Sequence, residues 1–588
     1  MPTRRSLIGP AAAIVAYENV VTVITGGELF TSGLAALTIS AVLIVAMIFW
    51  SSRCRLTLAE IGISRNGALR GAAIGVGVGA LMAIPVLLLS HSNSLTPRSV
   101  RSRTIHRVHD LIDRVLDLAN GSGAGYADCR VVERTVQHCA VKDGAVAEVN
   151  SFEDSGVGVR VVVDGGWGFA STDRVDAAGV TAMVVSAVRI ARASARVRHE
   201  PVRLAPTPVV QGRYETPVNR DPFSVSIGDK LGLLMDCDAA MSGITGISTR
   251  QASVECVRET RYFGNSEGTR TEQVIIESGG GLDATATSTD EVQTRSYPNS
   301  FGRHQLCAGW EAVEAMALAE NAEAIAHEAV ALLTAEPCPT GRMTLILDPT
   351  QAALQVHESC GHPTELDRAL GDEAAYAGTS FLEPPMLDSF RYGSEAVTIT
   401  ADATRATGLG TFGWDDEGVA AQRTTLVDRG LFTGYMTSRE TAARFEQPSN
   451  GTMRAEAWNR IPLIRMTNVN LEAGDSSLEE MVASTERGVY LQTNRSWSID
   501  DRRLNFQFGT QNGWEIRDGK RVRLVKNALY SGRTPDFWNS CDAVAGPAEW
   551  SMWGVVNCGK GQPGQVLHVG HGAASCRFQN VAITGARG

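Results

Sequence analysis

Two histidines and a glutamate stand within six residues of one another in the segment HESCGH, residues 357–362, an HExxxH pattern. Imidazole nitrogens are common zinc ligands, and a carboxylate beside them can take a proton from a zinc-bound water. The pattern is therefore typical of a hydrolytic zinc site. His357 and His362 are candidate ligands, and Glu358 is a candidate general base.

The spacing of the two histidines raises a geometric problem. In the familiar HExxH pattern the histidines are four residues apart and share one helical face. Histidines five residues apart are about 140° out of line in a regular helix, at 100° per residue. A local π-bulge would realign them, and Gly361 would ease that distortion. Without a bulge, the alternative is two unrelated helical histidines.

A zinc site also needs a third protein ligand. The C-terminal segment offers four candidates: Cys558, His568, His571 and Cys576. Cys558 lies in a Gly-rich stretch, where the backbone can approach a site closely and where Lys560 could favour the thiolate. The simpler interpretation of His568 and His571 is a pair on a strand. Cys360, inside the motif, is expected to pack in the core.

The residues before the motif predict a strand followed by a helix. The run Thr344–Leu347 is apolar and strand-like, Asp348 is a helix N-cap and Pro349 suits the first helical position. The helix is then expected to run through residues 351–356 into the motif. This order would place the two histidines at the end of a helix that begins at a sheet.

The rest of the chain predicts an α+β protein. Two N-terminal α/β domains, residues 105–200 and 215–333, are expected to precede a strand-rich C-terminal domain, residues 335–588. The expected helices are residues 105–120, 176–198, 224–240 and 311–333. The expected strands before the motif are residues 127–134, 156–163, 167–171, 253–258 and 271–277.

Two apolar runs come before these domains. Residues 29–50 and 71–89 are uncharged and reach the ~20 residues that cross ~30 Å of hydrocarbon. Residues 1–100 are therefore expected to form a membrane anchor with two transmembrane helices and a linker. Four arginines in the loop between the runs balance four after the second run, so the positive-inside rule does not decide the orientation.

Composition excludes other classes of protein. Across 588 residues, 54 Lys and Arg trail 64 Asp and Glu, for a net charge of -10, so no basic surplus exists to bind nucleic acid. Eleven cysteines at irregular spacing do not form a secreted disulfide framework. Free thiols in a reducing compartment fit better, and they favour the cytoplasmic side for the C-terminal domains.

Several motifs resemble the TldD/PmbA family of metallopeptidases in collinear order over about residues 105–588. In the N-terminal half they are GVGVRVVVDGGWGFAST (156–172) and FGNSEGT (263–269). In the C-terminal half they are HESCGHPTELDRALGD (357–372), FGWDDEGV (412–419), NGTMRAEAWNRIPLIRMTNVNLEAGD (450–475), RSWSIDDRRLNFQFG (495–509) and NCGKGQPGQVLHVGHG (557–572). The two apolar runs have no counterpart in this pattern.

The resemblance implies a zinc peptidase of the TldD-like, catalytic branch. It implies His357, His362 and Cys558 as zinc ligands and Glu358 as the general base acting on zinc-bound water. It also implies unfolded or small peptides as substrates, and a PmbA/TldE-like partner subunit in a heterodimer, with a homodimer as the alternative. A strand-rich domain could hold such peptides by β-addition.

Other interpretations stay open at this stage. The chain could be a non-catalytic subunit that binds peptides or a partner, or a membrane adaptor for a partner peptidase. His571 and Arg465 are candidate partners of an oxyanion or a substrate carboxylate, with structural hydrogen bonding as the simpler alternative. The run Asp415–Glu417 could support a metal or form a turn with solvated carboxylates, and residues 500–503 are expected to form ion pairs among themselves.

Overall fold

The computed structural model describes residues 97–585, with side chains from residue 108 onward. The two predicted membrane spans, residues 29–50 and 71–89, lie outside the described residues. Within the described part, helix α5 (Ala177–Ala195) is the one helix long and apolar enough to cross a membrane by length and composition. Its buried residues join a core with strands of the first sheet, as a helix of a globular domain does.

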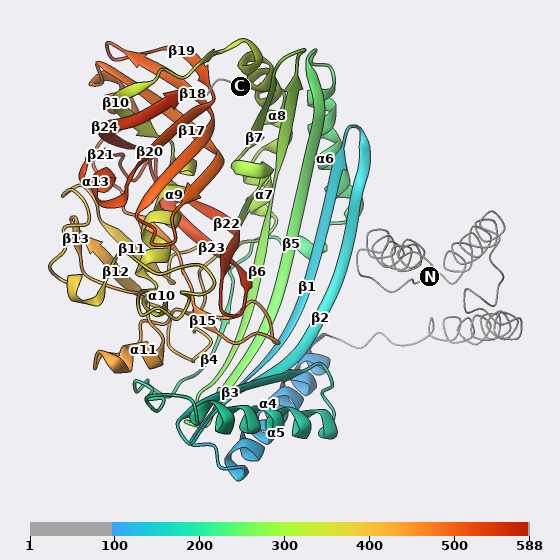
Figure 1. Ribbon diagram of the computed structural model, residues 1–588. Helices are drawn as coiled ribbons and strands as arrows, with labels where there is room; N and C mark the ends of the chain where they lie inside the picture. The colour runs from blue at the N-terminus through green and yellow to red at the C-terminus, as the bar shows by residue number, and fades with distance from the viewer. Residues whose placement is uncertain (1–96, 586–588) are drawn as a thin grey trace, which may run out of the picture. The chain divides into compact units, whose positions relative to one another are not determined.

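A long, mostly antiparallel sheet dominates the first half of the described chain (Figure 1). Its strand order is β3-β2-β1-β5-β6-β4, and β7 and β8 also pair with β6. The longest strands have 19 residues, about 60 Å at ~3.3 Å per residue. The four long strands are β1 (Tyr126–Lys142), β2 (Ala145–Val163), β5 (Ile247–Asn265) and β6 (Arg270–Thr287), and the short ones are β3 (Gly166–Thr172), β4 (Gln211–Glu215), β7 (Val292–Tyr297) and β8 (His304–Leu306).

The long strands extend well past the predicted strands. The predicted strand 127–134 is the first half of β1, which continues to a tight turn at Asp143 and Gly144, both with positive φ. An Asp-Gly pair with positive φ is the preferred two-residue hairpin turn. Strands from the segments 105–200 and 215–333 thus belong to one continuous sheet.

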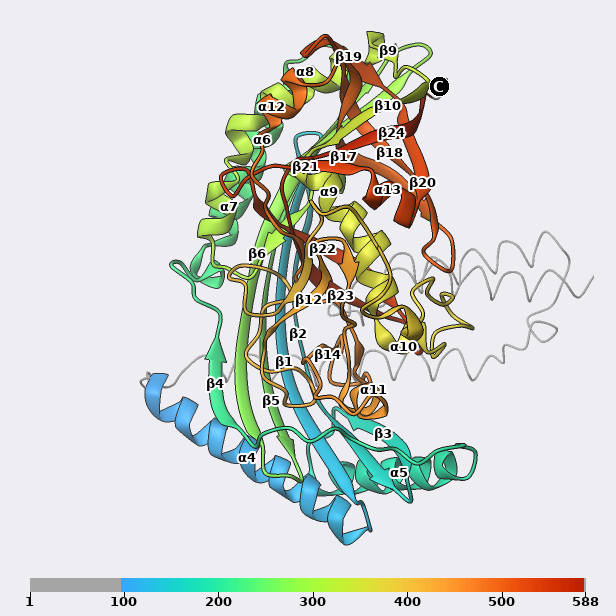
Figure 2. The ribbon, with the colours of Figure 1, turned by 90° about the vertical axis from the view of Figure 1, so that its left-hand side faces the viewer.

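This sheet carries two separate hydrophobic cores, one toward each end. Helices α4 (Pro97–Gly121) and α5 pack at one end, and α6 (Ile227–Ser242) and α8 (Leu318–Thr334) pack at the other (Figures 1 and 2). The predicted single helix 311–333 is divided in two. Ala317, in the left-handed region at φ 47°, separates α7 (Glu311–Ala315) from α8.

The second half of the described chain is built on a closed ring of strands. The order β17-β10-β24-β20-β18 closes because β18 also pairs with β17. The ring strands are β17 (Arg487–Ile499), β10 (Gly341–Leu347), β24 (Cys576–Gly585), β20 (Ala528–Arg533) and β18 (Asn505–Arg517), extended by β19 (Lys520–Lys526), β9 (Glu336–Pro337) and β21 (Cys541–Val544). The expected mixed, strand-rich architecture is confirmed.

Smaller elements complete this half of the chain. A sheet of order β13-β12-β11-β16 and the hairpin β22–β23 stand beside the ring. Their strands are β11 (Ile399–Asp402), β12 (Arg423–Asp428), β13 (Leu431–Phe432), β16 (Val469–Leu471), β22 (Ser551–Lys560) and β23 (Gln565–Ala573), with the short pair β14 (Met453–Arg454) and β15 (Leu463–Ile464). The helices are α9 (Pro349–Val356), α10 (Leu366–Ala369), α11 (Arg439–Arg444), α12 (Leu478–Ala483) and α13 (Thr534–Asn539).

Buried ion pairs join the two halves. Arg160 on β2 pairs with Asp128 at 2.7 Å and with Glu417 at 3.4 Å, and all three side chains are at most 3% exposed. Asp416 pairs with Arg130 at 3.4 Å and is fully buried. Residues 415–417 do form a turn, but the prediction that their carboxylates are solvated is wrong. Asp416 and Glu417 neutralise arginines of the long sheet, and the Asp415 carboxylate accepts backbone N–H groups in the interior.

Candidate metal centre

Helix α9 delivers the HExxxH motif to the interior of the second half. The Asp348 side chain accepts a hydrogen bond from the Gln351 N–H at 2.9 Å, and Pro349 occupies the first turn. Both features confirm the predicted start of the helix. The helix follows β10 directly, so the parallel pairing of β10 with β17 fixes where it begins.

The motif itself forms a π-helical turn over His357–Gly361. The realigning distortion predicted from the five-residue spacing is therefore confirmed. The role of Gly361 differs from the prediction, because its φ of -54° and ψ of -63° are ordinary helical values. A Cβ at Gly361 would instead overlap the thioether of Met466, so the glycine is needed for a close side-chain approach.

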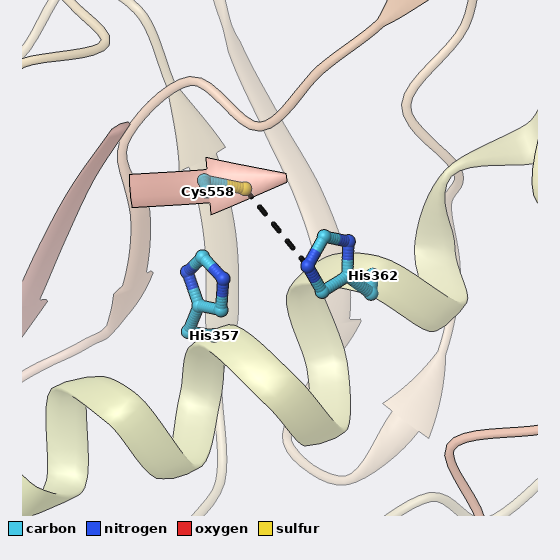
Figure 3. Close-up of side chains that lie close together, drawn as sticks. All are labelled: His357, His362 and Cys558. Carbon is cyan, nitrogen blue, oxygen red and sulfur yellow. Dashed lines mark hydrogen bonds between the residues drawn. The ribbon is translucent and has the colours of Figure 1, made fainter. Parts of the chain in front are cut away.

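The π-helical turn and strand β22 bring three metal-ligating side chains together (Figure 3). One ligand atom each from His357, His362 and Cys558 lie within 4.8 Å of one another. The Cys558 Sγ is 3.9 Å from the His362 Nε2. All three residues are buried, with exposed fractions of 3% or less.

Hydrogen bonds fix which nitrogen of each imidazole is free. The His571 Nδ1 lies 2.9 Å from the Val469 carbonyl oxygen, which can only accept, so His571 carries its proton there. The His571 Nε2 then accepts from the His357 Nδ1 at 2.8 Å. His362 donates from Nδ1 to the Glu365 carboxylate at 3.0 Å. Both candidate ligands therefore keep a lone pair on Nε2.

A charged neighbour favours the thiolate of Cys558. Burial alone would raise its pKa, but the pKa lies below the ordinary value, chiefly because of the Arg465 guanidinium. The predicted effect of Lys560 is wrong, because its Nζ is turned to the Asp367 carboxylate at 2.7 Å and is fully buried there. Arg465, also fully buried, donates to the Cys558 carbonyl oxygen.

These donors fit a tetrahedral zinc ion. Zn–N of about 2.0 Å and Zn–S of about 2.3 Å place neighbouring ligand atoms about 3.5 Å apart, close to the 3.9 Å between the Cys558 Sγ and the His362 Nε2. The contact between His362 and Glu365 is the carboxylate–histidine pair that usually orients a metal-bound imidazole. Burial also lowers the pKa of His357 and of His362, which keeps both rings neutral and able to bind a cation.

Glu358 lies beside this cluster on the wall of a large cavity. The cavity has a volume of about 870 Å³ and also contains His357, His362 and Cys558 in its lining. The Glu358 side chain is 7% exposed and pairs with the Arg503 guanidinium. The long sheet supplies part of the remaining wall, so both halves of the described chain line the space in front of Glu358.

The other candidates from the sequence lie elsewhere. His568 pairs with Glu277 of the long sheet at 2.6 Å and is not part of the cluster. Cys360 and Cys576 are fully buried in the core of the second half, as expected for Cys360. Each cysteine of the described residues is a free thiol.

Two supporting side chains, Glu365 and Arg503, were missed by sequence reasoning, whereas His571 was a candidate and takes the simpler role predicted for it, structural hydrogen bonding. Glu365 and His571 orient the two imidazoles, and Arg503 holds Glu358. The ion pairs expected within residues 500–503 are wrong, because Arg502 pairs with Glu383 and Arg503 with Glu358. Only Glu365 left a local signal, since it stands one helical turn after His362. The others come from segments more than 100 residues distant.

Three models of one family cover most of the described chain. The model described as PmbA/TldA metallopeptidase C-terminal domain matches residues 340–585. The model of domain 1 matches residues 127–191, and that of the central domain matches residues 220–335.

Curated relatives and a solved structure agree with these models. A metalloprotease of Methanocaldococcus jannaschii is 30% identical over 79% of this chain and 97% of its own length. A metalloprotease TldD homolog of Haemophilus influenzae is 25% identical over 84% and 98%, and a zinc metalloprotease TldD homolog of Saccharolobus solfataricus is 25% identical over 42% and 52%. TldE from Thermococcus kodakarensis shares the fold, with a TM-score of 0.63, 16% identity and coverage of 81% and 100%.

The family models and the curated relatives define a metallopeptidase, a hydrolase of peptide bonds. The three domain models and the full-length relative at 30% identity show more than a shared fold. The chain belongs to the PmbA/TldD family of metallopeptidases.

Proposed function

We propose that this protein is a zinc-dependent peptidase that cleaves unfolded or small peptides, with His357, His362 and Cys558 as zinc ligands and Glu358 as general base. The observation that carries the proposal is the cluster of three ligand atoms within 4.8 Å beside Glu358 on one cavity. The zinc in the name of the Saccharolobus solfataricus relative supports the choice of metal.

The residues around the cluster have separate tasks in this proposal. His571 and Glu365 hold the two imidazoles with Nε2 lone pairs directed inward, and Arg465 favours the Cys558 thiolate. A bound zinc ion would polarise the scissile carbonyl and make water acidic enough to react near pH 7. Glu358 accepts the proton of the attacking water and delivers it to the leaving amine.

The first experiment measures zinc content and turnover of the full chain, purified in detergent without chelators. Near one zinc per chain is expected. Glu358→Gln should keep the zinc and lose peptide hydrolysis, whereas His357→Ala and Cys558→Ala should lose the zinc. Cys576→Ala, another buried cysteine, is the matched control and should keep it. A wild-type protein without zinc, or a Glu358→Gln variant with full turnover, would refute the proposal.

The N-terminal segment is proposed to anchor the peptidase to a membrane, with the family domains on the cytoplasmic side. Support comes from the two uncharged apolar runs and from a buried free thiol as a ligand, which suits a reducing compartment. The full chain should stay in the membrane pellet after alkaline carbonate extraction, and a chain lacking residues 1–96 should not. Protease should degrade the family domains in inverted vesicles and spare them in intact spheroplasts.

A PmbA/TldE-like subunit is the proposed partner, with a homodimer as the alternative. The shared fold with TldE from Thermococcus kodakarensis supports a pairing of similar chains. Co-expression of the full chain with a PmbA/TldE-like subunit from the same genome, followed by affinity purification and light scattering, tests it. Recovery of a 1:1 complex is expected, and a monomer in both the presence and the absence of that subunit would refute both assemblies.

A further inference from the structure

Arg503 is placed against the general base by a constrained turn between β17 and β18. Its φ is 64°, a left-handed value that is unfavourable for a residue with a side chain. The Arg503 N–H donates to the Asp500 carbonyl at 2.8 Å, and the Thr534 hydroxyl donates to the Arg503 carbonyl at 2.8 Å. A strained residue held from both sides is often a functional one.

The Arg503 side chain is only partly used by the protein. Its Nη1 pairs with the Glu358 carboxylate and it lines the cavity, where the side chain is 14% exposed. Its Nε is buried and has no hydrogen-bond partner among residues 108–585. A guanidinium has five N–H donors, and a second anionic oxygen can therefore join or replace Glu358.

Asn494 places a hydrogen-bond acceptor on the same cavity, where Arg503 places a donor. Its side chain is 2% exposed, and its Nδ2 donates to the carbonyls of Ser496 at 3.1 Å and Gly509 at 3.3 Å. Because a flipped amide would place its oxygen against both carbonyls, the orientation is fixed. The Oδ1 is left as a buried acceptor without a donor in the described part of the chain.

We propose that Arg503 binds an anionic oxygen of the peptide substrate beside Glu358, and that Asn494 accepts a backbone N–H of the same peptide. This inference rests on the proposed function. When Glu358 takes a proton from the attacking water, a C–O bond forms and the π pair of the scissile carbonyl moves to its oxygen. The negative charge thus leaves the carboxylate and appears on the substrate, while the Arg503 cation stays between the two positions.

A terminal carboxylate of the peptide is the other source of an anionic oxygen. Peptides in free-acid and amidated form distinguish the two sources. If Arg503 binds the oxyanion, its loss lowers turnover equally for both forms. If Arg503 binds the terminal carboxylate, loss of Arg503 raises KM for the free-acid peptide alone. The wild type should then have a lower KM for the free-acid peptide than for the amidated one.

The test compares Arg503→Gln, Arg503→Lys and the matched control Arg502→Gln, whose arginine is half exposed and pairs with Glu383. All three are expected to fold and to keep zinc. Arg503→Gln should lose about 100- to 1000-fold in kcat with the oxyanion as ligand, and added guanidinium should restore part of it. The kcat of Arg503→Lys should lie between those of Arg503→Gln and the wild type, and the kcat of Arg502→Gln should match the wild type.

Binding provides a readout that does not depend on turnover. The probe is a phosphinic pseudopeptide, whose tetrahedral anion imitates the oxyanion, measured by calorimetry on the zinc-loaded variants. Its affinity should fall about 100-fold in Arg503→Gln, whereas Asn494→Leu should raise KM about tenfold for either peptide form.

An active wild type together with an Arg503→Gln variant within threefold in kcat, KM and probe affinity would overturn the inference and leave the proposed function standing. A wild type without zinc or turnover would instead refute the proposed function itself.

Discussion

Replacing His571 by phenylalanine should weaken zinc binding although His571 is not a proposed ligand. The ring would keep its volume but lose the acceptor that now faces the His357 Nδ1 at 2.8 Å. In the zinc-free protein His357 can move its proton to Nε2. Zinc binding requires the lone pair on the His357 Nε2, so the proton must return to the His357 Nδ1. In the variant this buried N–H would face the phenyl ring without an acceptor.

The expected loss of zinc affinity follows from this difference between the zinc-free and the zinc-bound protein. Loss of a second-layer partner of a metal-binding histidine typically costs 10- to 100-fold in metal affinity, or about 1.4 to 2.8 kcal/mol. His571→Gln, whose amide oxygen can accept the same hydrogen bond, should recover part of the loss. The assay is competition for zinc with a chromophoric chelator at pH 7.5, with zinc-free stability measured in parallel.

The matched control is His568→Phe on the same strand, β23. His568 pairs with Glu277 and has no contact with the ligands, so the zinc dissociation constant should stay within about twofold of the wild type. Wild-type zinc affinity in His571→Phe, or equal losses in His571→Phe and His568→Phe, would refute the proposed hydrogen-bond chain.

Three further predictions concern stability, measured by urea unfolding of the zinc-free protein. Gly361→Ala should cost about 1–3 kcal/mol through overlap with Met466, and Met466→Ala in the same chain should recover part of it; no loss in the single variant would contradict the packing argument. Burial lowers the pKa of His304 to about 4. Below about pH 6.5, His304 is therefore protonated in the unfolded chain but stays neutral in the folded chain. Between pH 6.5 and 4 the free energy of unfolding of His304→Phe should therefore fall less than that of the wild type, by about 3 kcal/mol. The same fall with pH in both proteins would exclude His304 as the cause. Arg160→Leu leaves the buried carboxylates of Asp128 and Glu417 without their cation and should cost about 3 kcal/mol or more. Arg174→Leu, which removes an exposed ion pair, should change the free energy of unfolding little. Similar losses in both variants would contradict the argument from burial.

Local sequence patterns were sufficient for the start of the motif helix and for its distortion. Asp348 and Pro349 mark a helix start by their own backbone chemistry, and the five-residue spacing of His357 and His362 demands a π-helical turn if both face one site. Both depend on neighbours within a few residues, which is the range over which sequence patterns are informative.

Patterns were less reliable where a whole sheet determines the structure. The first long strand was predicted to end at Arg134, yet β1 continues to Lys142 between two paired strands. Backbone hydrogen bonds to both neighbours stabilise an extended chain there, whatever the side chains. Likewise the sequence predicts solvated carboxylates at Asp416 and Glu417, because their arginine partners lie more than 150 residues away.

The sequence by itself determined the chemistry available to this protein: two imidazoles, a carboxylate and a set of candidate thiols. Tertiary structure decided which of these groups meet. It placed Cys558 rather than Cys576 near His362, assigned the proton of His357 through His571, and brought Arg503 to Glu358. The physical reason is that hydrogen bonds and ion pairs act over about 3 Å in space, and only folding brings residues separated by 100 to 200 positions within that distance.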